Sequence, residues 1–177
     1  EILNHPVINV SRDDEAYDDW AGMALPNKEI LNHPVVCVSW DDAKAYADWA
    51  SMQLPSEQDW EKAARGTDGR IYPWGDNWVE GYCNTVEAWV HEEGKGKTTR
   101  VGQYPADANS PYGCVDMAGN VWEWTDSLYV KGETDRVKRG GSFHRDQDHA
   151  RTYSRFSDPP NTRLDHLGFR VARCLPP

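Results

Sequence analysis

Apolar residues recur with helical spacing only in the first part of the chain. Ala45, Tyr46 and Trp49 share one face of a helix predicted over 40–52. Ser39 can accept hydrogen bonds from the first amides of this helix, and the aspartates that follow suit its first turn, where the helix dipole favours negative charge. A capped helix is therefore expected to begin at about residue 40.

A second, shorter helix is expected directly afterwards. Leu54 and Pro55 end the first helix, and Ser56 with Asp59 three residues later resembles a capping box. Gly66 is placed to end the second helix. Both expected helices thus precede the long irregular part of the sequence.

The remaining sequence has strand patterns. Short runs with strand character are separated by Gly, Pro, Asn and Asp. The expected strands are 34–38 before the first helix, then 72–75, 98–104, 121–125, 136–143 and 168–173. Two early helices followed by short, irregular antiparallel strands predict the α+β class.

The chain opens with an internal repeat. Residues 1–7 recur unchanged as residues 29–35, and the two copies align over about 28 residues. Two copies are too few for a solenoid, which needs several stacked units to bury a core. We therefore interpret 1–28 as a duplicated N-terminal segment (a copy of 29–57) and 29–177 as one domain.

Composition narrows the kinds of partner. The 177 residues suffice for one well-packed domain, and nine tryptophans carry much of its burial. The formal charge of −10 argues against nucleic acid or anionic lipid as the main partner. No apolar run approaches the length of a membrane span and the N-terminus has no signal pattern, so direct membrane insertion is not expected.

The four cysteines leave two kinds of chemistry open. Cys37, Cys83, Cys114 and Cys174 have wide, irregular spacing and no CxxC pair, which excludes the usual zinc patterns. Buried thiols and one or two disulfides both fit this spacing, and we prefer buried thiols.

A series of motifs gives the chain a specific resemblance. The most distinctive are Leu54-Pro-Ser-Glu-x-x-Trp60-Glu61, Gly119-Asn-Val-Trp-Glu-Trp124, Arg139-Gly-Gly-Ser-Phe143 and Gly168-Phe-Arg170. In this order they resemble the domain of formylglycine-generating enzymes, also called sulfatase-modifying factors, from about residue 30 to residue 173. The resemblance implies a C-type-lectin-like fold with sparse regular structure.

The chain departs from these enzymes at the reaction centre. Active members are similar to one another in having a cysteine pair between the Arg-Gly-Gly-Ser and Gly-Phe-Arg motifs, where copper binds and oxygen chemistry occurs. Here no cysteine lies between Cys114 and Cys174, and neither serine nor tyrosine replaces a thiolate as nucleophile or soft-metal ligand. We therefore expect no enzymatic activity, no catalytic residues and no catalytic cofactor.

The segment between these two motifs carries a narrower resemblance. Its regular skeleton is similar to the variable proteins of diversity-generating retroelements, in which template adenines are replaced at random and the products omit Lys, Glu, Gln, Met and Trp. From Gly140 to Cys174, Gln147 is the single residue outside the permitted set, and we assign it to the skeleton. The skeleton consists of Gly140-Gly-Ser-Phe143, Gln147, Ala150-Arg151, Arg155, Arg163 and Leu167-Gly-Phe-Arg170.

The positions between skeleton residues form a candidate variable region, 144–166. We predict that they form a solvent-facing ligand-binding surface, with Tyr153 and Phe156 as aromatic anchors. The alternative is an ordinary surface loop of a degenerate enzyme. The predicted ligand-binding residues are His144, Arg145, Asp146, Asp148, His149, Tyr153, Ser154, Phe156, Ser157, Asp158, Asn161, Thr162, Leu164, Asp165 and His166.

The sequence contains candidate ligands for two kinds of metal site. The family resemblance implies structural calcium, because carboxylates and backbone carbonyls are hard oxygen ligands; the alternative is that these side chains satisfy turn amides. One implied site is Asp116, Gly119, Val121 and Glu123, and the other is Asn84 and Thr85 with Glu93 and Lys95. A transition-metal cluster is disfavoured, because no known spacing matches His144, His149 and His166 with Asp146, Asp148 and Asp165.

Together these features predict a non-enzymatic protein that binds a ligand or receptor. The partner expected is a protein or glycan on a target surface, which favours a virion or cell surface as the location. Two alternatives remain: an enzyme of the same fold with unrecognised oxidase chemistry, and a structural subunit that packs against partners through an apolar patch. The sequence leaves the oligomeric state open.

Overall fold

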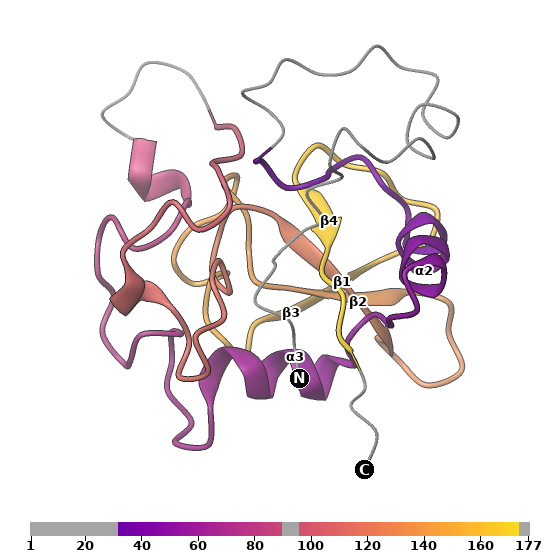
Figure 1. The fold of residues 1–177 in the computed structure, drawn as a ribbon, viewed down its shortest axis with the longest axis horizontal. Helices are drawn as coiled ribbons and strands as arrows, with labels where there is room; N and C mark the ends of the chain where they lie inside the picture. Colours follow the sequence, from indigo (N-terminus) through magenta and orange to yellow (C-terminus); the bar gives the residue numbers. More distant parts are fainter. Residues whose placement is uncertain (1–31, 90–95, 174–177) are drawn as a thin grey trace.

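The computed structural model describes residues 32–89 and 96–173 (Figure 1). The duplicated segment 1–28 and Cys174 lie outside these residues. Two α-helices precede a four-stranded sheet, so the α+β class is confirmed. The elements are α2 (Trp40–Trp49), α3 (Glu57–Arg65), the 3-10 turns η1 (Val86–Trp89) and η2 (Ala106–Ala108), and the strands β1 (Trp122–Leu128), β2 (Arg136–Arg139), β3 (Arg155–Asp158) and β4 (Leu167–Phe169).

The sheet has the order β3-β2-β1-β4 and is mixed. β1 and β3 each run antiparallel to β2, but β4 runs parallel to β1, with Trp122 opposite Leu167. The expectation of purely antiparallel strands is therefore wrong for one pair. A parallel pair requires a long crossover, and the chain between β1 and β4, which includes β2 and β3, supplies one.

Three expected strands do not form. Segment 98–104 contains no strand, 72–75 contributes only a bridge between Tyr72 and Gly75, and 34–38 remains irregular. The amide of Cys37 bonds to the Leu164 carbonyl instead of to a sheet. These segments have strand-forming composition, but their backbone groups form hydrogen bonds with loops instead of with neighbouring strands.

Helix α2 begins as predicted and ends early. The Ser39 side chain accepts from the Asp42 amide, and the Asp42 carboxylate accepts from the Ser39 amide at 2.7 Å, which completes a capping box. Ser51 adopts a left-handed φ of 54°, and the Met52 amide donates to the Ala47 carbonyl. This turn ends the helix at Trp49, before the expected residue 52.

The buried face of α2 is not the predicted one. Ala43 and Ala47 are fully buried, whereas Trp49 is 59% exposed. Small side chains let this helix pack closely on the core, so the larger residues of the neighbouring face remain outside. Tyr46 lies between the two faces and contacts both Trp49 and Phe169.

Helix α3 matches its predicted bounds and lies against the sheet. Ser56 caps it through the Asp59 amide, and Gly66 follows its last turn with a φ of 67°. Trp60, Ala63 and Ala64 form its buried face. Figure 1 shows α3 running below the sheet and α2 lying to one side of it.

Large aromatic side chains fill the core. Trp122 and Trp124 of β1 pack with Leu167 and Phe169 of β4, while Trp60 centres a second cluster under α3. Gly168 is required at this packing distance, because a Cβ atom there would lie 2.3 Å from the Val35 carbonyl oxygen. This close packing makes a rigid frame for the segment that follows β2.

Candidate functional site

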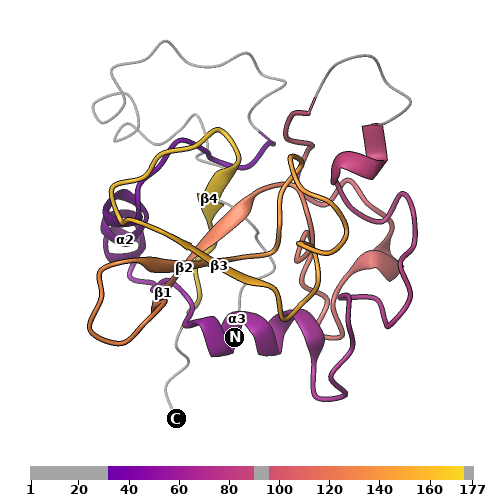
Figure 2. The same cartoon turned by 180° about the vertical axis from the view of Figure 1, so that it is seen from behind.

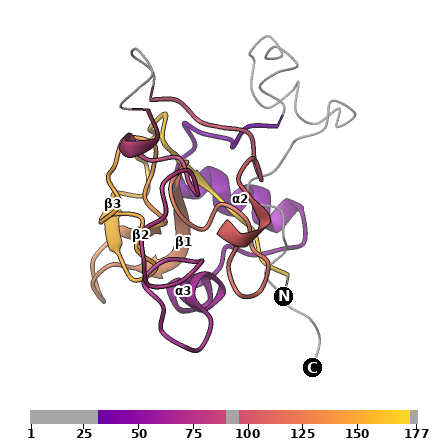
Figure 3. The same cartoon turned by 90° about the vertical axis from the view of Figure 1, so that its left-hand side faces the viewer.

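The predicted binding residues lie on one continuous segment, 144–166, that passes over the sheet and contributes its edge strand β3. Figure 2 shows this orange-to-yellow segment crossing the near side of the molecule, and Figure 3 shows β3 at the sheet edge away from α2. None of the fifteen predicted residues is buried. Skeleton residues such as Phe143, Ala150 and Leu167 are buried. These skeleton residues therefore lie in the core, whereas the predicted contact positions are at least partly exposed.

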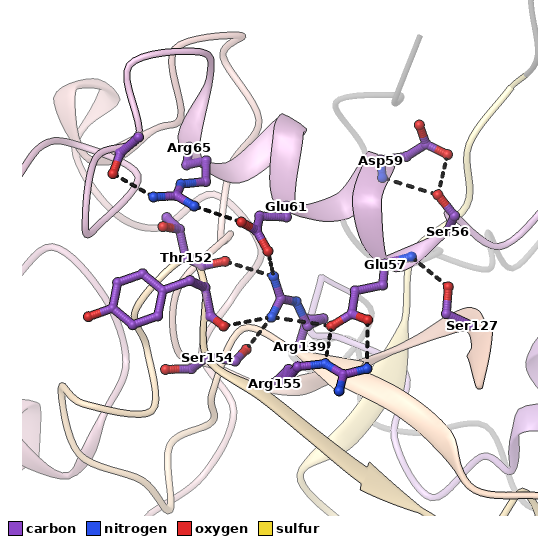
Figure 4. A network of polar contacts seen from close by, with 12 residues as sticks. Ser56, Glu57, Asp59, Glu61, Arg65, Ser127, Arg139, Thr152, Ser154 and Arg155 are labelled. Carbon is purple, nitrogen blue, oxygen red and sulfur yellow. Dashed lines mark hydrogen bonds and ion pairs between the residues drawn. The ribbon is translucent and has the colours of Figure 1, made fainter. Parts of the chain in front are cut away.

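Arg139 connects this segment to helix α3 (Figure 4). Its guanidinium group is fully buried and donates to the carbonyl oxygens of Thr152, Tyr153 and Ser154 at 2.8–3.0 Å. These bonds fix three consecutive peptide groups without using a side chain of the segment. The side chains of Tyr153 and Ser154 remain exposed or partly exposed.

Two glutamates of α3 neutralise this buried arginine. The Arg139 guanidinium group pairs with the Glu61 carboxylate and lies 3.5 Å from that of Glu57. Burial lowers the pKa of Arg139, and the negative charges of Glu61 and Glu57 oppose that shift. Glu57 also accepts two bonds from Arg155, at 2.7 and 2.9 Å, in a fork geometry. Helix α3 thus holds both β2 and β3.

Further bonds fix the segment at intervals. Near its start, the Val86 amide donates to the Arg145 carbonyl at 3.0 Å and the Gln147 amide donates to Glu87 at 2.9 Å. Near its end, the Trp40 amide donates to the Pro160 carbonyl at 2.8 Å. On the segment's side all three contacts use backbone groups, so they do not depend on which side chain occupies a predicted contact position.

The two predicted aromatic anchors are accessible. Tyr153 is 43% exposed and Phe156 is 41% exposed. The Phe156 ring rests on a built surface, since its centroid lies 5.1 Å from both Trp122 and His149. An exposed ring packed against the buried Trp122 ring and the partly exposed His149 ring is suited to anchor a ligand, because little side-chain freedom remains to be lost on binding.

Besides Phe156, other predicted positions also contact the frame. Leu164 packs against the main core cluster, and Asp158 forms an ion pair with Lys138. Arg163, from the skeleton, pairs with Asp42 at the start of α2. The surface therefore consists of free positions interrupted by side chains that also hold the segment in place.

The first implied calcium site is occupied by protein donors in this structure. Glu123 is 2% exposed, and its carboxylate accepts from the Trp60 indole and from Arg170, both at 2.6 Å. Burial raises the pKa of Asp116, which accepts from the Gly102 amide at 2.7 Å. Asp116 thus accepts from a turn amide, as the alternative interpretation states, whereas Glu123 accepts from two core side chains. Calcium here stays a prediction.

The second implied calcium site is described in part. Asn84 and Thr85 are both buried, and the Asn84 side chain donates to the Lys97 carbonyl at 2.8 Å. The Thr85 hydroxyl has no hydrogen-bond partner in the described residues. Glu93 and Lys95 lie outside the described residues, so this ligand set also stays a prediction.

The six histidine and aspartate residues of the disfavoured metal cluster divide into separate groups. His144, Asp165 and His166 bring one ligand atom each within 4.8 Å of one another. His149 pairs with Asp146 at 2.6 Å, apart from that group. Sequence spacing failed to show the first group because His144 lies more than twenty residues before Asp165 and His166 and meets them only through the fold.

The described cysteines are free thiols. Cys83 and Cys114 are buried as predicted, and burial raises the pKa of the Cys83 thiol well above its usual range. Cys37 is free but exposed, so the burial predicted for it is wrong. It lies in the irregular segment before α2, where its φ is 60°.

A shallow hollow of about 500 Å³ lies beside the segment, between α3 and β3. Four of its charged lining residues form ion pairs, Glu61 with Arg65 and Glu57 with Arg155, and Lys62 is the fifth charged residue of the lining. The hollow thus offers paired charges at the border of the predicted binding surface.

Sequence reasoning missed the residues that position the segment. Arg139, Glu57 and Glu61 were recognised as motif members without a structural role, and the Arg70 carbonyl that accepts from Thr152 at 2.8 Å was not considered. The signal available was charge within otherwise apolar motifs, since a buried arginine requires carboxylate or carbonyl partners.

Among the described residues, no helix is long and apolar enough to span a membrane.

Comparison with known proteins identifies the family. Residues 27–175 match the sulfatase-modifying factor enzyme 1-like domain. The inactive C-alpha-formylglycine-generating enzyme 2 of Bos taurus is 40% identical over 86% of this chain and 54% of its own length. The formylglycine-generating enzyme of Mus musculus is 35% identical over 96% of this chain and 44% of its own length. The chain thus spans about half the length of these relatives, which include proteins named as enzymes and proteins named as inactive.

Solved structures show the same fold. PvdO from Pseudomonas aeruginosa superposes with a TM-score of 0.71 and 26% identity over 90% of this chain and 75% of its own. Treponema denticola variable protein 1 superposes with a TM-score of 0.62 and 20% identity over 86% of this chain and 75% of its own. The Major Tropism Determinant P3c variant gives a TM-score of 0.53 and 14% identity over 75% of this chain and 36% of its own. By its sequence match and its C-type-lectin-like fold, the chain belongs to the sulfatase-modifying factor family.

Proposed function

We propose that this protein is a non-enzymatic binding protein that displays a diversified surface, residues 144–166, on a sulfatase-modifying factor scaffold. The observation that carries the proposal is that the groups that anchor this segment are mostly different from the side chains that it exposes. Backbone groups and skeleton side chains hold it to the frame, with added side-chain contacts from Asp158 and Leu164, and all fifteen candidate positions are at least partly exposed. Such a surface can change its side chains without losing its anchors.

The chemistry of the surface supports protein or glycan ligands on a target surface. Its exposed residues combine aromatic rings with histidine, aspartate, asparagine and arginine, which supply hydrogen bonds and charge around apolar anchors. Proteins named as a variable protein and as a tropism determinant share the fold. By analogy with these names, a virion or cell surface is the location we propose.

The missing cysteines support a binding role over catalysis. Between Cys114 and Cys174 the chain has no thiol to act as nucleophile or copper ligand. Relatives include formylglycine-generating enzymes, so an enzyme of this fold is the competing proposal. It requires other reactive groups, and the carboxylate of Glu123, the most buried acid of the region, already pairs with Arg170.

A library experiment tests this proposal. All fifteen positions are randomised together with the codon set that excludes Lys, Glu, Gln, Met and Trp, and the pool is displayed and challenged with protease. Most members are expected to remain folded, and selection on immobilised serum albumin is expected to yield binders. A matched pool randomised at Glu57, Glu61, Arg139, Arg155 and Arg163 is expected to be degraded. Equal loss in both pools, or no binder from the first, would contradict the proposal.

A further inference from the structure

Two histidines and an aspartate from the two ends of segment 144–166, here called the display segment, lie close together. The Nδ1 atom of His166 lies 2.7 Å from Oδ1 of Asp165, and the Nε2 atom of His144 lies 3.9 Å from the same oxygen. The two imidazole rings are perpendicular, with centroids 5.0 Å apart. One ligand atom from each residue falls within 4.8 Å of the others.

The frame holds the backbone of this group. The carbonyl of His166 accepts from the Trp122 amide at 2.8 Å, directly before β4. His144 follows Phe143, whose amide donates to the Asn120 carbonyl at 2.9 Å. The buried Phe143 ring contacts both imidazoles, with centroid distances of 4.2 and 6.2 Å. The two histidines therefore share an apolar base and are fixed at their backbone.

We propose that His144, Asp165 and His166 form a binding site for one divalent transition-metal ion of the zinc class. Imidazole nitrogen and carboxylate oxygen are ligands that zinc accepts, at bond lengths of about 2.0–2.2 Å. In a tetrahedron of that size the ligand atoms are roughly 3.4 Å apart. The distances of 2.7 and 3.9 Å to Oδ1 of Asp165 lie on either side of this value. Coordination requires side-chain rotations that lengthen the shorter of these distances and shorten the longer one.

The charge and exposure of the group suit an open site. Asp165 is an anion at neutral pH, and its Oδ1 atom lies within hydrogen-bond distance of Nδ1 of His166. The side chains of His144 and Asp165 are 41% and 69% exposed, whereas that of His166 is 16% exposed. Three protein ligands leave a fourth position of zinc open toward solvent.

An open position makes the ion part of the display surface. A carboxylate or imidazole of a bound partner can complete the coordination, which converts a weak surface contact into a directed one. This second step rests on the proposed binding function, whereas metal binding itself does not. Failure to bind zinc leaves the library experiment unaffected, so the two proposals fail separately.

Calorimetric titration of the chelator-treated full chain with zinc chloride tests the site. We expect one ion per chain, and a roughly tenfold or greater loss of affinity in His144→Ala and in His166→Ala. His149→Ala is the matched control, because that histidine also pairs with an aspartate but lies outside the group. The absence of saturable binding, or equal affinity in all three variants, overturns the proposal. Circular dichroism confirms that each variant is folded.

The cobalt-substituted protein tests the open position. Adding imidazole to the one-to-one cobalt complex is expected to change its visible absorption, because a new ligand enters the metal coordination. The same addition to His166→Ala is expected to give no comparable change. An unchanged spectrum for the wild-type complex shows a closed coordination sphere and overturns the inference that the ion can link to a partner.

Discussion

At the scale of single residues, two buried arginines hold the molecule together. Arg170 lies between β4 and β1 and binds the Glu123 carboxylate through two nitrogen atoms. Arg139 binds three carbonyl groups of the display segment and two glutamates of α3. Each buried charge is matched, since an unmatched charge in the core carries a large desolvation cost.

Replacing one member of the buried pair tests this interpretation. Glu123→Gln removes the negative charge that compensates Arg170 and is expected to lower the free energy of unfolding by about 3–5 kcal/mol, measured by urea denaturation. Glu133→Gln, an exposed position between β1 and β2, is the control and is expected to stay within roughly 0.5 kcal/mol of the parent. Repeating the measurements with EDTA separates the ion pair from calcium: destabilisation of the parent by EDTA that is absent in Glu123→Gln would assign Glu123 to the metal instead.

At the scale of elements, local signals in the sequence predicted the helices better than the strands. The caps Ser39 and Ser56 and the terminator Gly66 act within one turn, so they are visible in the sequence. Strand β3 was not predicted, because Arg155 to Asp158 lack apolar alternation and become a strand by pairing with β2. The early end of α2 depends on the left-handed turn at Ser51, for which the sequence holds no glycine signal.

The capping box of α2 gives a prediction with a defined pH dependence. Burial raises the pKa of Asp42, but hydrogen bonds from Ser39 and the ion pair with Arg163 outweigh it, so the folded-state pKa is below the usual value. A lowered carboxyl pKa stabilises the fold above the unfolded-state pKa of about 3.9 and loses this effect as the pH falls through the folded-state value.

Asp42→Asn is therefore expected to lower the free energy of unfolding by about 1 kcal/mol near neutral pH. The difference from the parent should shrink as the pH falls below about 3.9, measured by urea denaturation across that range. Asp41→Asn, at an exposed position in the same helical turn but outside the capping box, is the control for loss of a carboxylate from this turn. A difference for Asp42→Asn that is constant with pH would contradict the role of the carboxylate.

At the scale of the whole molecule, the frame and the display segment differ in amino-acid composition. Lys, Glu, Trp and Met are frequent before residue 139, whereas the segment after it has a restricted composition; that contrast was readable from the sequence. Which frame residues support the segment was not readable, because Glu57 and Arg155 are 98 positions apart and meet only in the fold. The exposure of the fifteen positions agrees with a surface open to change.

The most direct measurement is sequencing of many copies of this gene together with any near-identical repeat near it. The display account predicts that substitutions concentrate at the fifteen positions from His144 to His166 and coincide with adenines in the repeat. It also predicts unchanged codons for Arg139, Arg155 and Arg163. Copies that are identical in this segment, or that vary evenly along the chain, would contradict the account and leave a degenerate member of an enzyme family.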